Sequence, residues 1–506
     1  MSRPVTRREA LVALGAGGVA LWLAGCGGGG PRTAAGAARD GSTLLSTYAD
    51  PSGDGLLHVR GGEPLVARTE LAPVAARGAV LATLAHLTDA HVLDAQSPAR
   101  VPFLDRLGPP FGSTFRPQET LTYAVLDGAA RAVRALAPDA VIQGGDLVDN
   151  AQLNELTAGL ALLRGGPVDP DSGTRGYVGV QSASDADPFY YRPDLDAPVH
   201  RGLLGAAVRP FVAAGLAAPW YPVLGDHDLL VQGVVPPSPL TEAIAVGDRA
   251  LYELPVGLSG EVRGVAASDQ TPDGLAAPQP IDSLLGQLLA QPSVVTVPAD
   301  PRRREVSAGE MVSMLRVGSG SGGRTGGPFM NYAFDVGSAV RVIVLDLVRR
   351  AGGSGGLAQP GQAAWLAGAV ASASRAGRWM LVFSHQPLAS SVGGPALLAV
   401  LDRSPRVVAA IAGHTHRNRI VPRRSSGAGY WLIETASLVD YPQQSRALRL
   451  VETAGGGVAL DTWMLDHVPS RLGDISRSLA FIDVHGGRPQ GFAGGALDRN
   501  VVLYRG

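Results

Sequence analysis

The order of apolar and polar positions predicts a chain in which short buried strands alternate with amphipathic helices. Helical spacing runs over residues 121–137, where Pro138 ends it, and over residues 362–373. Apolar runs predict strands at 80–87, 139–143, 222–224, 340–346, 379–383, 407–411, 430–434, 446–452 and 458–465. Strands that alternate with helices imply a sheet covered by helices on both faces.

Two stretches interrupt this alternation, at about 165–199 and 256–328. Both are rich in Gly and Pro, and loops of this length inside a compact domain are usually functional or disordered. We therefore expect two insertions near the rim of a site. The second contains the run Arg302, Arg303 and Arg304, which is interpreted as a solvated surface run rather than a phosphate site.

Composition narrows the class of protein. The chain has 506 residues, of which 45% are hydrophobic and 17% charged, so it is predicted to be globular. The formal net charge is −1 and no basic stripe is present, which argues against a nucleic-acid partner. The sequence contains no lysine, which excludes a lysine Schiff base, pyridoxal chemistry and a Walker-type phosphate loop.

The N-terminus is predicted to be a targeting segment. Arg7 and Arg8 lie in a stretch that resembles a twin-arginine export signal, and an apolar run leads to Leu23-Ala24-Gly25-Cys26, which resembles a bacterial lipobox. The alternative for Cys26, the only cysteine, is an ordinary buried thiol. The resemblance implies export and anchoring through lipidated Cys26 to the outer face of the cytoplasmic membrane, in the cell envelope.

The predicted organisation follows from these boundaries. Residues 1–26 are a signal peptide, 27–43 a flexible tether and 44–79 a segment of unclear role. Residues 80–467 form the main domain with both insertions, and 468–506 are a C-terminal extension of unknown role.

Metal-binding residue types follow five predicted strands. Because strand ends converge on one crevice in open α/β folds, we expect these side chains to lie together. Imidazoles and carboxylates in one set suit Mn, Fe or Zn better than Ca or Mg. The candidate metal ligands are Asp89, His91, Asp146, Asp226, His385, His414 and His416.

The spacing of these motifs resembles the calcineurin-like metallophosphoesterases. D-x-H, G-D-x-x-D-N, a G-D-H-D variant of G-N-H-D/E, a lone His after a strand, and G-H-x-H occur in that order from Asp89 to His416. The resemblance implies two mixed β-sheets packed as a sandwich and flanked by helices, an α/β fold of four layers. It also implies an enzyme that hydrolyses phosphate esters with two divalent metal ions.

The resemblance further assigns roles. Asp146 bridges the metals, His227 protonates the leaving alkoxide or stabilises the equatorial oxygens, and Asp228 orients His227. One metal is held by Asp89, His91, Asp146 and His416, and the other by Asp146, Asp226, His385 and His414.

One position departs from the family pattern. The family has Asn where this chain has Asp226, and the additional carboxylate is expected to weaken Lewis acidity and repel a phosphate dianion. We expect Asp226 still to bind metal while lowering turnover or shifting metal preference. The alternative is a catalytically weakened protein of this fold that binds phosphorylated ligands.

Asp149 occupies the place where purple acid phosphatases carry an iron-binding Tyr, which argues against that subgroup. Asp149 and Asn150 are predicted to fix the loop of Asp146 through backbone groups. The remaining histidines are predicted to be packed rather than metal-bound: His58, His86, His200, His467 and His485.

The expected partner is a phosphorylated small molecule or an envelope polymer. Neither monoester, diester nor pyrophosphate is favoured by the sequence, and the oligomeric state is not predicted. A dinuclear hydrolase of amides or lactones is a further alternative, although such enzymes usually order their ligands differently.

Overall fold

The computed structural model describes residues 41–108, 112–253, 286, 294–319, 329–426 and 428–506. The predicted signal peptide and most of the tether, including Arg7, Arg8 and Cys26, lie outside the described residues. Within the described part of the chain, no helix is both long enough and apolar enough to cross a membrane.

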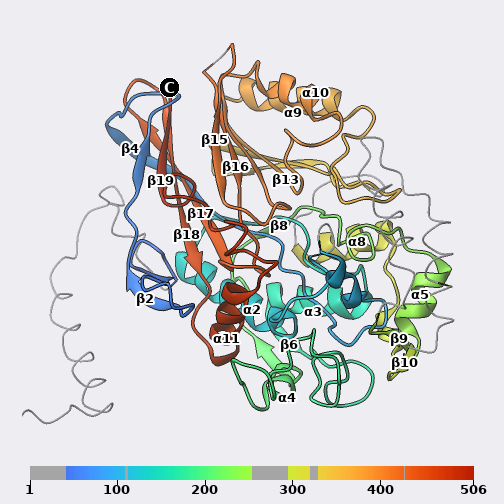
Figure 1. Cartoon of the computed structure of the whole chain (residues 1–506). Helices are drawn as coiled ribbons and strands as arrows, with labels where there is room; N and C mark the ends of the chain where they lie inside the picture. The colour runs from blue at the N-terminus through green and yellow to red at the C-terminus, as the bar shows by residue number, and fades with distance from the viewer. Residues whose placement is uncertain (1–40, 109–111, 254–285, 287–293, 320–328, 427) are drawn as a thin grey trace, which may run out of the picture. The chain divides into compact units, whose positions relative to one another are not determined.

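Two mixed sheets contain most of the strands (Figure 1). The seven-stranded sheet has the order β3 (Val66–Arg68), β19 (Val501–Arg505), β18 (Val458–Asp466), β17 (Gln444–Thr453), β4 (Arg77–Leu87), β5 (Ala140–Gln143) and β8 (Trp220–Pro222). The six-stranded sheet has the order β11 (Tyr332–Val336), β12 (Val340–Leu345), β13 (Trp379–Ser384), β14 (Val407–Ala412), β16 (Tyr430–Glu434) and β15 (Arg419–Arg423). In each sheet a parallel part, β4-β5-β8 or β12-β13-β14-β16, adjoins antiparallel strands.

The helices and small sheets surround these two sheets. The helices are α2 (Thr122–Leu136), α3 (Leu153–Arg164), α4 (Leu203–Ala207), α5 (Pro239–Val246), α8 (Ala308–Ser319), α9 (Gln362–Arg375), α10 (Gly394–Leu401) and α11 (Arg471–Ile482), with short 3-10 turns η2 (Pro102–Leu107), η3 (Glu119–Leu121) and η4 (Pro301–Arg303). Three two-stranded sheets pair β1 (Ser46–Ala49) with β2 (His58–Gly61), β6 (Gly166–Val168) with β7 (Phe211–Ala213), and β9 (Arg249–Leu251) with β10 (Val294–Thr296).

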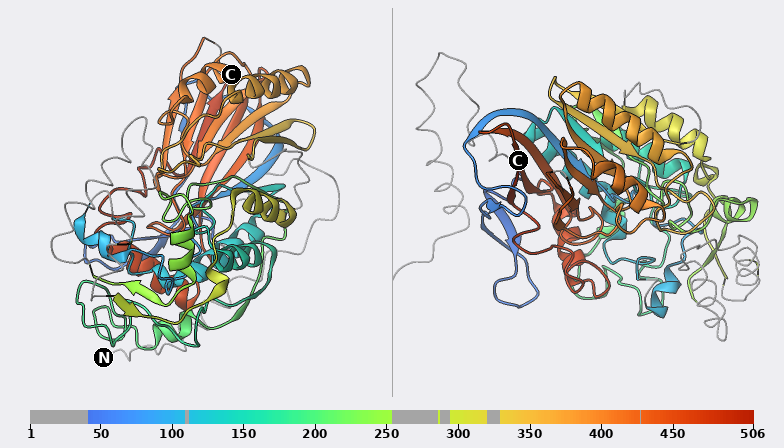
Figure 2. Two further views of the ribbon diagram at one scale, coloured as in Figure 1. Left: turned by 90° about the vertical axis from the view of Figure 1, so that its right-hand side faces the viewer. Right: turned by 90° about the horizontal axis from the view of Figure 1, so that it is seen from above.

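Side-chain alternation along the strands explains the layers. In β12, Val342 and Val344 join a core shared with β4, β17 and β18, whereas Ile343 and Leu345 join a second core with α9 and α10. Helix α2 packs against β17 and β18 on the seven-stranded sheet. Figures 1 and 2 show the two sheets as separate layers, with α9 and α10 beside the six-stranded one.

This arrangement confirms the sandwich that the family resemblance implied. The inference from alternation alone, a sheet with helices on both faces, is wrong, because one face of each large sheet packs against the other sheet. Alternation along the chain gives the local order of elements, whereas the division into two sheets depends on pairings between distant segments such as β4 and β17.

Segments without an assigned role contribute to the sheets. Residues 44–79 supply the β1-β2 hairpin and β3, and the C-terminal residues 468–506 supply α11 and β19. The second stretch predicted as a loop is partly regular. Its helix α8 buries Met311, Val312 and Leu315, whose spacing of one, three and four residues fits one helical face.

Candidate metal centre

The predicted ligands lie on loops that follow strands of both large sheets. The loops after β4, β5 and β8 carry Asp89, Asp146 and Asp226, and the loops after β13 and β14 carry His385 and His414. Backbone hydrogen bonds hold these loops against one another. The amide of Asp89 donates to the carbonyl of Gly145 (3.0 Å), and that of Gly413 donates to the carbonyl of His385 (3.0 Å).

Glycines in the motifs allow this close approach. A Cβ atom at Gly225 would collide with the Asp146 carboxylate, and one at Gly145 would collide with the His385 ring. Gly145 also has a φ of 98°, a conformation that favours glycine. These two glycines therefore leave room for a neighbouring ligand, which explains why glycine precedes Asp146 and Asp226.

Five ligand residues adopt the left-handed backbone conformation. Their φ angles are 53° for Asp89, 42° for His91, 48° for Asp146, 65° for His414 and 54° for His416. Non-glycine residues rarely adopt positive φ, and each such residue costs on the order of 1–3 kcal/mol. The conformation turns these side chains toward a common point at the strand ends.

The first ligand group consists of Asp89, His91 and His416. The two imidazole Nε2 atoms lie 3.3 Å apart, and His416 Nε2 lies 3.3 Å from Asp89 Oδ1. All three side chains are buried or nearly so. Three potential ligand atoms thus face the same point.

The second group consists of Asp146, Asp226, His385 and His414. Asp226 Oδ1 lies 3.2 Å from His385 Nε2 and 3.1 Å from His414 Nδ1. Asp146 Oδ2 lies 3.1 Å from His385 Nε2 and 3.7 Å from His91 Nε2 of the first group. Asp146 therefore lies between the two groups.

The residues present fit two divalent cations. His385 Nε2 is fully buried and forms no hydrogen bond, although three carboxylates lie within 3.1 to 3.8 Å of it. An unbonded ring nitrogen among carboxylates is a ligand set for a cation. Three carboxylates and four imidazoles together suit Zn, Mn or Fe.

Carboxylates outside both groups orient the first group's histidines. His91 Nδ1 lies 2.9 Å from Asp149 Oδ1, and His416 Nδ1 lies 2.6 Å from Asp440 Oδ2. Arg116 in turn donates from Nε to Asp440 Oδ1 at 2.7 Å. Burial alone would lower the pKa of His416, but the negative charges of Asp89 and Asp440 raise it to about 9. Each carboxylate fixes the ring so that its Nε2 faces the centre.

His227 lies beside Asp146 and His91, with 15% of its side chain exposed. Its Nδ1 lies 2.8 Å from the carbonyl oxygen of Asp149, and its ring is 4.5 Å from that of His91. Burial alone would lower the pKa of His227, but the negative charges of Asp146, Asp149 and Asp226 raise it to about 10. These charges favour the protonated form of His227, whose ring contacts that of His91 and whose amide donates to Asp146 Oδ1.

The predicted role of Asp228 in orienting His227 is wrong. Asp228 is fully buried and accepts hydrogen bonds from four backbone amides, those of Asp146, Leu147, Val148 and Gly225, at 2.9 to 3.3 Å. It therefore fixes the loop of Asp146. The group that holds His227 is the carbonyl of Asp149.

The prediction for Asp149 and Asn150 is partly wrong. The Asp149 carboxylate bonds side chains, those of His91 and Gln232, while Asn150 Oδ1 accepts a backbone bond from Gln232. The backbone amides of residues 149 and 150 instead donate to the buried Glu155. Burial, together with nearby Asp149, raises the pKa of Glu155 to about 8.

Asp226 has a hydrogen-bond donor next to it that the sequence did not predict. Gln386 Nε2 donates to Asp226 Oδ1 at 3.0 Å, on the oxygen that faces His385 and His414. Burial would raise the pKa of Asp226, but the charges of His414 and His385 hold it well below its usual value. The residue at the unusual position is thus ionised and turned into the centre.

Five other histidines lie outside the candidate ligand groups found among the described residues. Their interpretation as packed is wrong for His58, because half of its side chain is exposed. His86, in contrast, is fully buried and bonded to Thr435, and burial lowers its pKa to about 3. The interpretation of the arginine run is wrong for Arg303, which is buried and paired with Asp94, whereas Arg302 is about half exposed.

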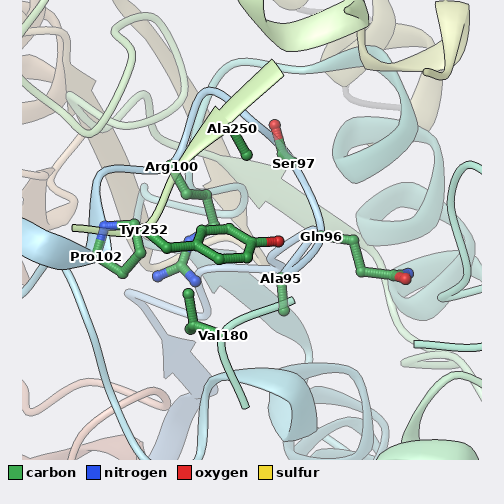
Figure 3. Close-up of a pocket in the computed structure, with 8 residues that line it drawn as sticks. All are labelled: Ala95, Gln96, Ser97, Arg100, Pro102, Val180, Ala250 and Tyr252. Atoms are coloured by element: carbon green, nitrogen blue, oxygen red, sulfur yellow. The ribbon is translucent and has the colours of Figure 1, made fainter. Parts of the chain in front are cut away.

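A separate small cavity lies beside the loop that follows His91 (Figure 3). Its lining residues are Ala95, Gln96, Ser97, Arg100, Pro102, Val180, Ala250 and Tyr252. None of the predicted metal ligands lines it, so the cavity is distinct from the metal centre.

Comparisons with known proteins find similarity only among solved structures. No family model matches the sequence, and no curated protein matches it. A dimetal phosphatase from Danio rerio is similar at 12% identity and a TM-score of 0.37, over 77% of this chain and 99% of that one.

Two further structures are similar at a comparable level. A purple acid phosphatase from yellow lupin seeds has 12% identity and a TM-score of 0.30, over 81% of this chain and 54% of that one. The sulfate thiohydrolase SoxB from Thermus thermophilus, in complex with glycerol, has 14% identity and a TM-score of 0.29, over 82% of this chain and 61% of that one. Because these likenesses are distant, the function is argued below from the geometry of the centre.

Proposed function

We propose that this protein hydrolyses phosphate esters with a dinuclear metal centre. The observation that carries the proposal is the meeting of seven side chains from five loops in two ligand groups, with Asp146 between them. A phosphate ester is anionic, so a hydrolytic site must bring positive charge to its phosphoryl oxygens. The first group would hold one cation and the second group the other.

When bound, two divalent cations polarise the phosphoryl group and lower the pKa of a water molecule toward neutrality. The protein contributes the arrangement around them. Asp149 and Asp440 keep the His91 and His416 rings in one orientation, and Asp228 holds the loop that carries Asp146. These fixed contacts reduce the reorganisation that the reaction requires.

His227 is the proposed proton donor to the leaving oxygen. The carbonyl oxygen of Asp149 can only accept a hydrogen bond, so Nδ1 of His227 carries a proton. Nε2 of His227 is then left to donate a proton to the substrate. The pKa of His227 is raised to about 10 by Asp146, Asp149 and Asp226. Cations bound to Asp146 and Asp226 would offset part of this effect, which would bring the pKa nearer to neutrality and suit general-acid catalysis.

The test combines metal content with hydrolysis on one purified sample. The protein is loaded with Mn, Zn or Fe and assayed on aryl phosphate monoesters and diesters, with His227→Ala as the control. Two metals per chain and activity that is lost in His227→Ala would support the proposal and show the preferred ester class. A chain that binds no metal would contradict it.

A second candidate function is a metal-containing protein that binds phosphorylated ligands with little turnover. It is favoured by Asp226, whose carboxylate adds a negative charge to the centre. Two metals without hydrolysis of any ester, together with activity restored in Asp226→Asn, would support this alternative.

We also propose a location and a class of substrate. The twin-arginine pattern and Cys26 support export and anchoring to the outer face of the cytoplasmic membrane. The substrate would then be a phosphorylated small molecule or polymer of the cell envelope. Release of Cys26→Ser from the membrane fraction, with wild type retained there, tests the anchor.

A further inference from the structure

Part of the second predicted insertion is joined by backbone hydrogen bonds to the metal-binding loop. The amide of Leu153 donates to the carbonyl of Arg304 (2.9 Å), and the amide of Val306 donates to the carbonyl of Ala151 (2.8 Å). Between them, Gln152 and Glu305 form an antiparallel bridge. Residues 151–153 directly follow Asn150, so this segment extends the loop that carries Asp146.

The same segment contributes a buried arginine. The side chain of Arg303 is fully buried, and its Nε donates to Asp94 Oδ2 at 3.0 Å. Its two terminal nitrogens donate to the carbonyl of Pro298 and to Ser172 Oγ, both at 2.8 Å. Ser172, from the first predicted insertion, donates in turn to Asp94 Oδ1 at 2.8 Å. Both insertions therefore meet at Asp94.

Hydrogen bonds connect Asp94 to the centre. Asp94 follows His91 by three residues, and its amide donates to Glu155 Oε1 at 2.9 Å. The other oxygen of Glu155 accepts the amides of Asp149 (3.2 Å) and Asn150 (2.8 Å). Asp149 bonds the His91 ring at 2.9 Å. The path from Arg303 to a metal ligand is thus continuous.

We propose that Arg303 is a positioning residue of the metal centre. By pairing with Asp94 it fixes the loop of His91 against the loop of Asp146, so the two insertions form part of the site's framework. This inference rests on the dinuclear centre proposed above. It also explains why Arg303 is buried, whereas Arg304 of the same run pairs with Glu310 and both of these side chains are more than a third exposed.

The physical reason is that the buried carboxylate of Asp94 requires a counter-charge. Without Arg303, Asp94 would retain Ser172, Asn154 and the amide of Gln96 as donors but would lack a counter-charge. Removing one partner of a buried ion pair is strongly destabilising, so the loop would move to expose Asp94 to water. Movement of that loop would displace His91 first, because His91 lies on it.

The experiment compares Arg303→Met with Arg304→Met, a control from the same run whose partner Glu310 is about a third exposed. Calorimetric titration with Mn²⁺ measures both binding steps, which His91→Ala and His414→Ala assign to the first and second ligand groups. We expect Arg303→Met to lower the Mn²⁺ affinity of the first group about tenfold and to leave that of the second group unchanged. Tenfold is the lower end of the range for residues that support metal ligands. Arg304→Met should bind Mn²⁺ like wild type.

A second variant separates positioning from general stability. Asp94→Asn combined with Arg303→Met removes the uncompensated charge, so thermal stability should recover. Metal binding at the first group should remain weak, because the contact between residues 303 and 94 that holds the His91 loop is still missing. Recovery of both would overturn the inference, as would wild-type binding in Arg303→Met. If the single variant does not fold, the double variant decides between these results.

The outcome remains separable from the proposed function. Wild type that binds two metals without hydrolysing any ester would contradict the hydrolase, but the titration would still decide the role of Arg303. Wild type that binds no metal would overturn both.

Discussion

The two ligand groups differ in charge and in what holds their histidines. The first has one carboxylate and two imidazoles, and carboxylates of Asp149 and Asp440 hold both rings. The second has two carboxylates and two imidazoles, and His385 Nδ1 is held by a neutral carbonyl, that of Gly144, at 2.9 Å.

This difference shows where the protein places negative charge. In the first group the additional carboxylates, those of Asp149 and Asp440, bond the ring Nδ1 atoms, on the other side of each ring from Nε2. In the second group the additional carboxylate, Asp226, faces the cation position itself. We therefore expect the first site to depend on residues outside the ligand set, and the second to depend on the ligands' own charge.

The largest expected effect comes from a residue outside both groups. In His227→Ala, both metals should remain bound while kcat falls about 10²–10⁴-fold, because a general acid is lost. Metal analysis and steady-state kinetics on the same sample measure this. A variant that also loses a metal would place His227 among the ligands, and the division into two groups would need revision.

The next effect should distinguish the groups directly. Asp440→Asn weakens the support of His416, so metal affinity at the first group should fall about 10–100-fold while the second serves as the internal control. Titration with Mn²⁺ measures both. Equal weakening of both sites would show that Asp440 supports the fold rather than one ligand.

A smaller effect is expected at the second group. Asp226→Asn removes one negative charge and keeps an oxygen ligand, so turnover should rise about tenfold, equivalent to about 1.4 kcal/mol, or metal preference should shift. Kinetics with Mn, Zn and Fe measure this. If Asp226→Asn has the same activity and the same metal preference as wild type, the prediction that Asp226 modifies the site is wrong.

The smallest effect concerns stability of the metal-free protein. The pKa values of His227 and His416 are raised to about 10 and about 9, so their stabilising contribution is complete below about pH 6.5 and is lost as the pH rises through those values. Glu155, with a pKa raised to about 8, also lowers the stability of the folded protein as the pH rises, because its ionisation in the folded state is unfavourable.

We therefore expect the melting temperature of the metal-free protein to fall by a few degrees between pH 7 and pH 10. The decrease should be smaller in His227→Ala. Calorimetric scans across this range test the prediction, and a constant or rising melting temperature would disagree with it.

The sequence predicted the ligands better than the residues that support them. The seven ligands follow strand ends in short motifs, which are local signals, and the structure brings all seven together. Asp440 and Arg303 could not be predicted in this way. Asp440 is identified by its contact with His416, and Arg303 by its contact with Asp94. Both partners are distant in the chain, and neither Asp440 nor Arg303 lies in a motif.

The same physical reason explains the errors in fold and roles. The helices α2 and α9 and the strands after residue 80 have clear periodicity, and the structure contains them, except that the strand predicted at 222–224 lies at Trp220–Pro222. Helix α8 was overlooked because Gly and Pro around it suggested a loop. Asp228 was assigned to His227 because they are adjacent in sequence, although its partners are the amides of residues 146–148 and 225.

The positive φ angles of five ligand residues have a consequence for how this sequence can drift. Glycine at His416, for example, would relieve backbone strain but would remove a candidate ligand. Backbone strain at these positions is thus tied to side chains that face the centre. Retention of Asp and His at all five strained positions is what continued use of the metals would leave in the sequence.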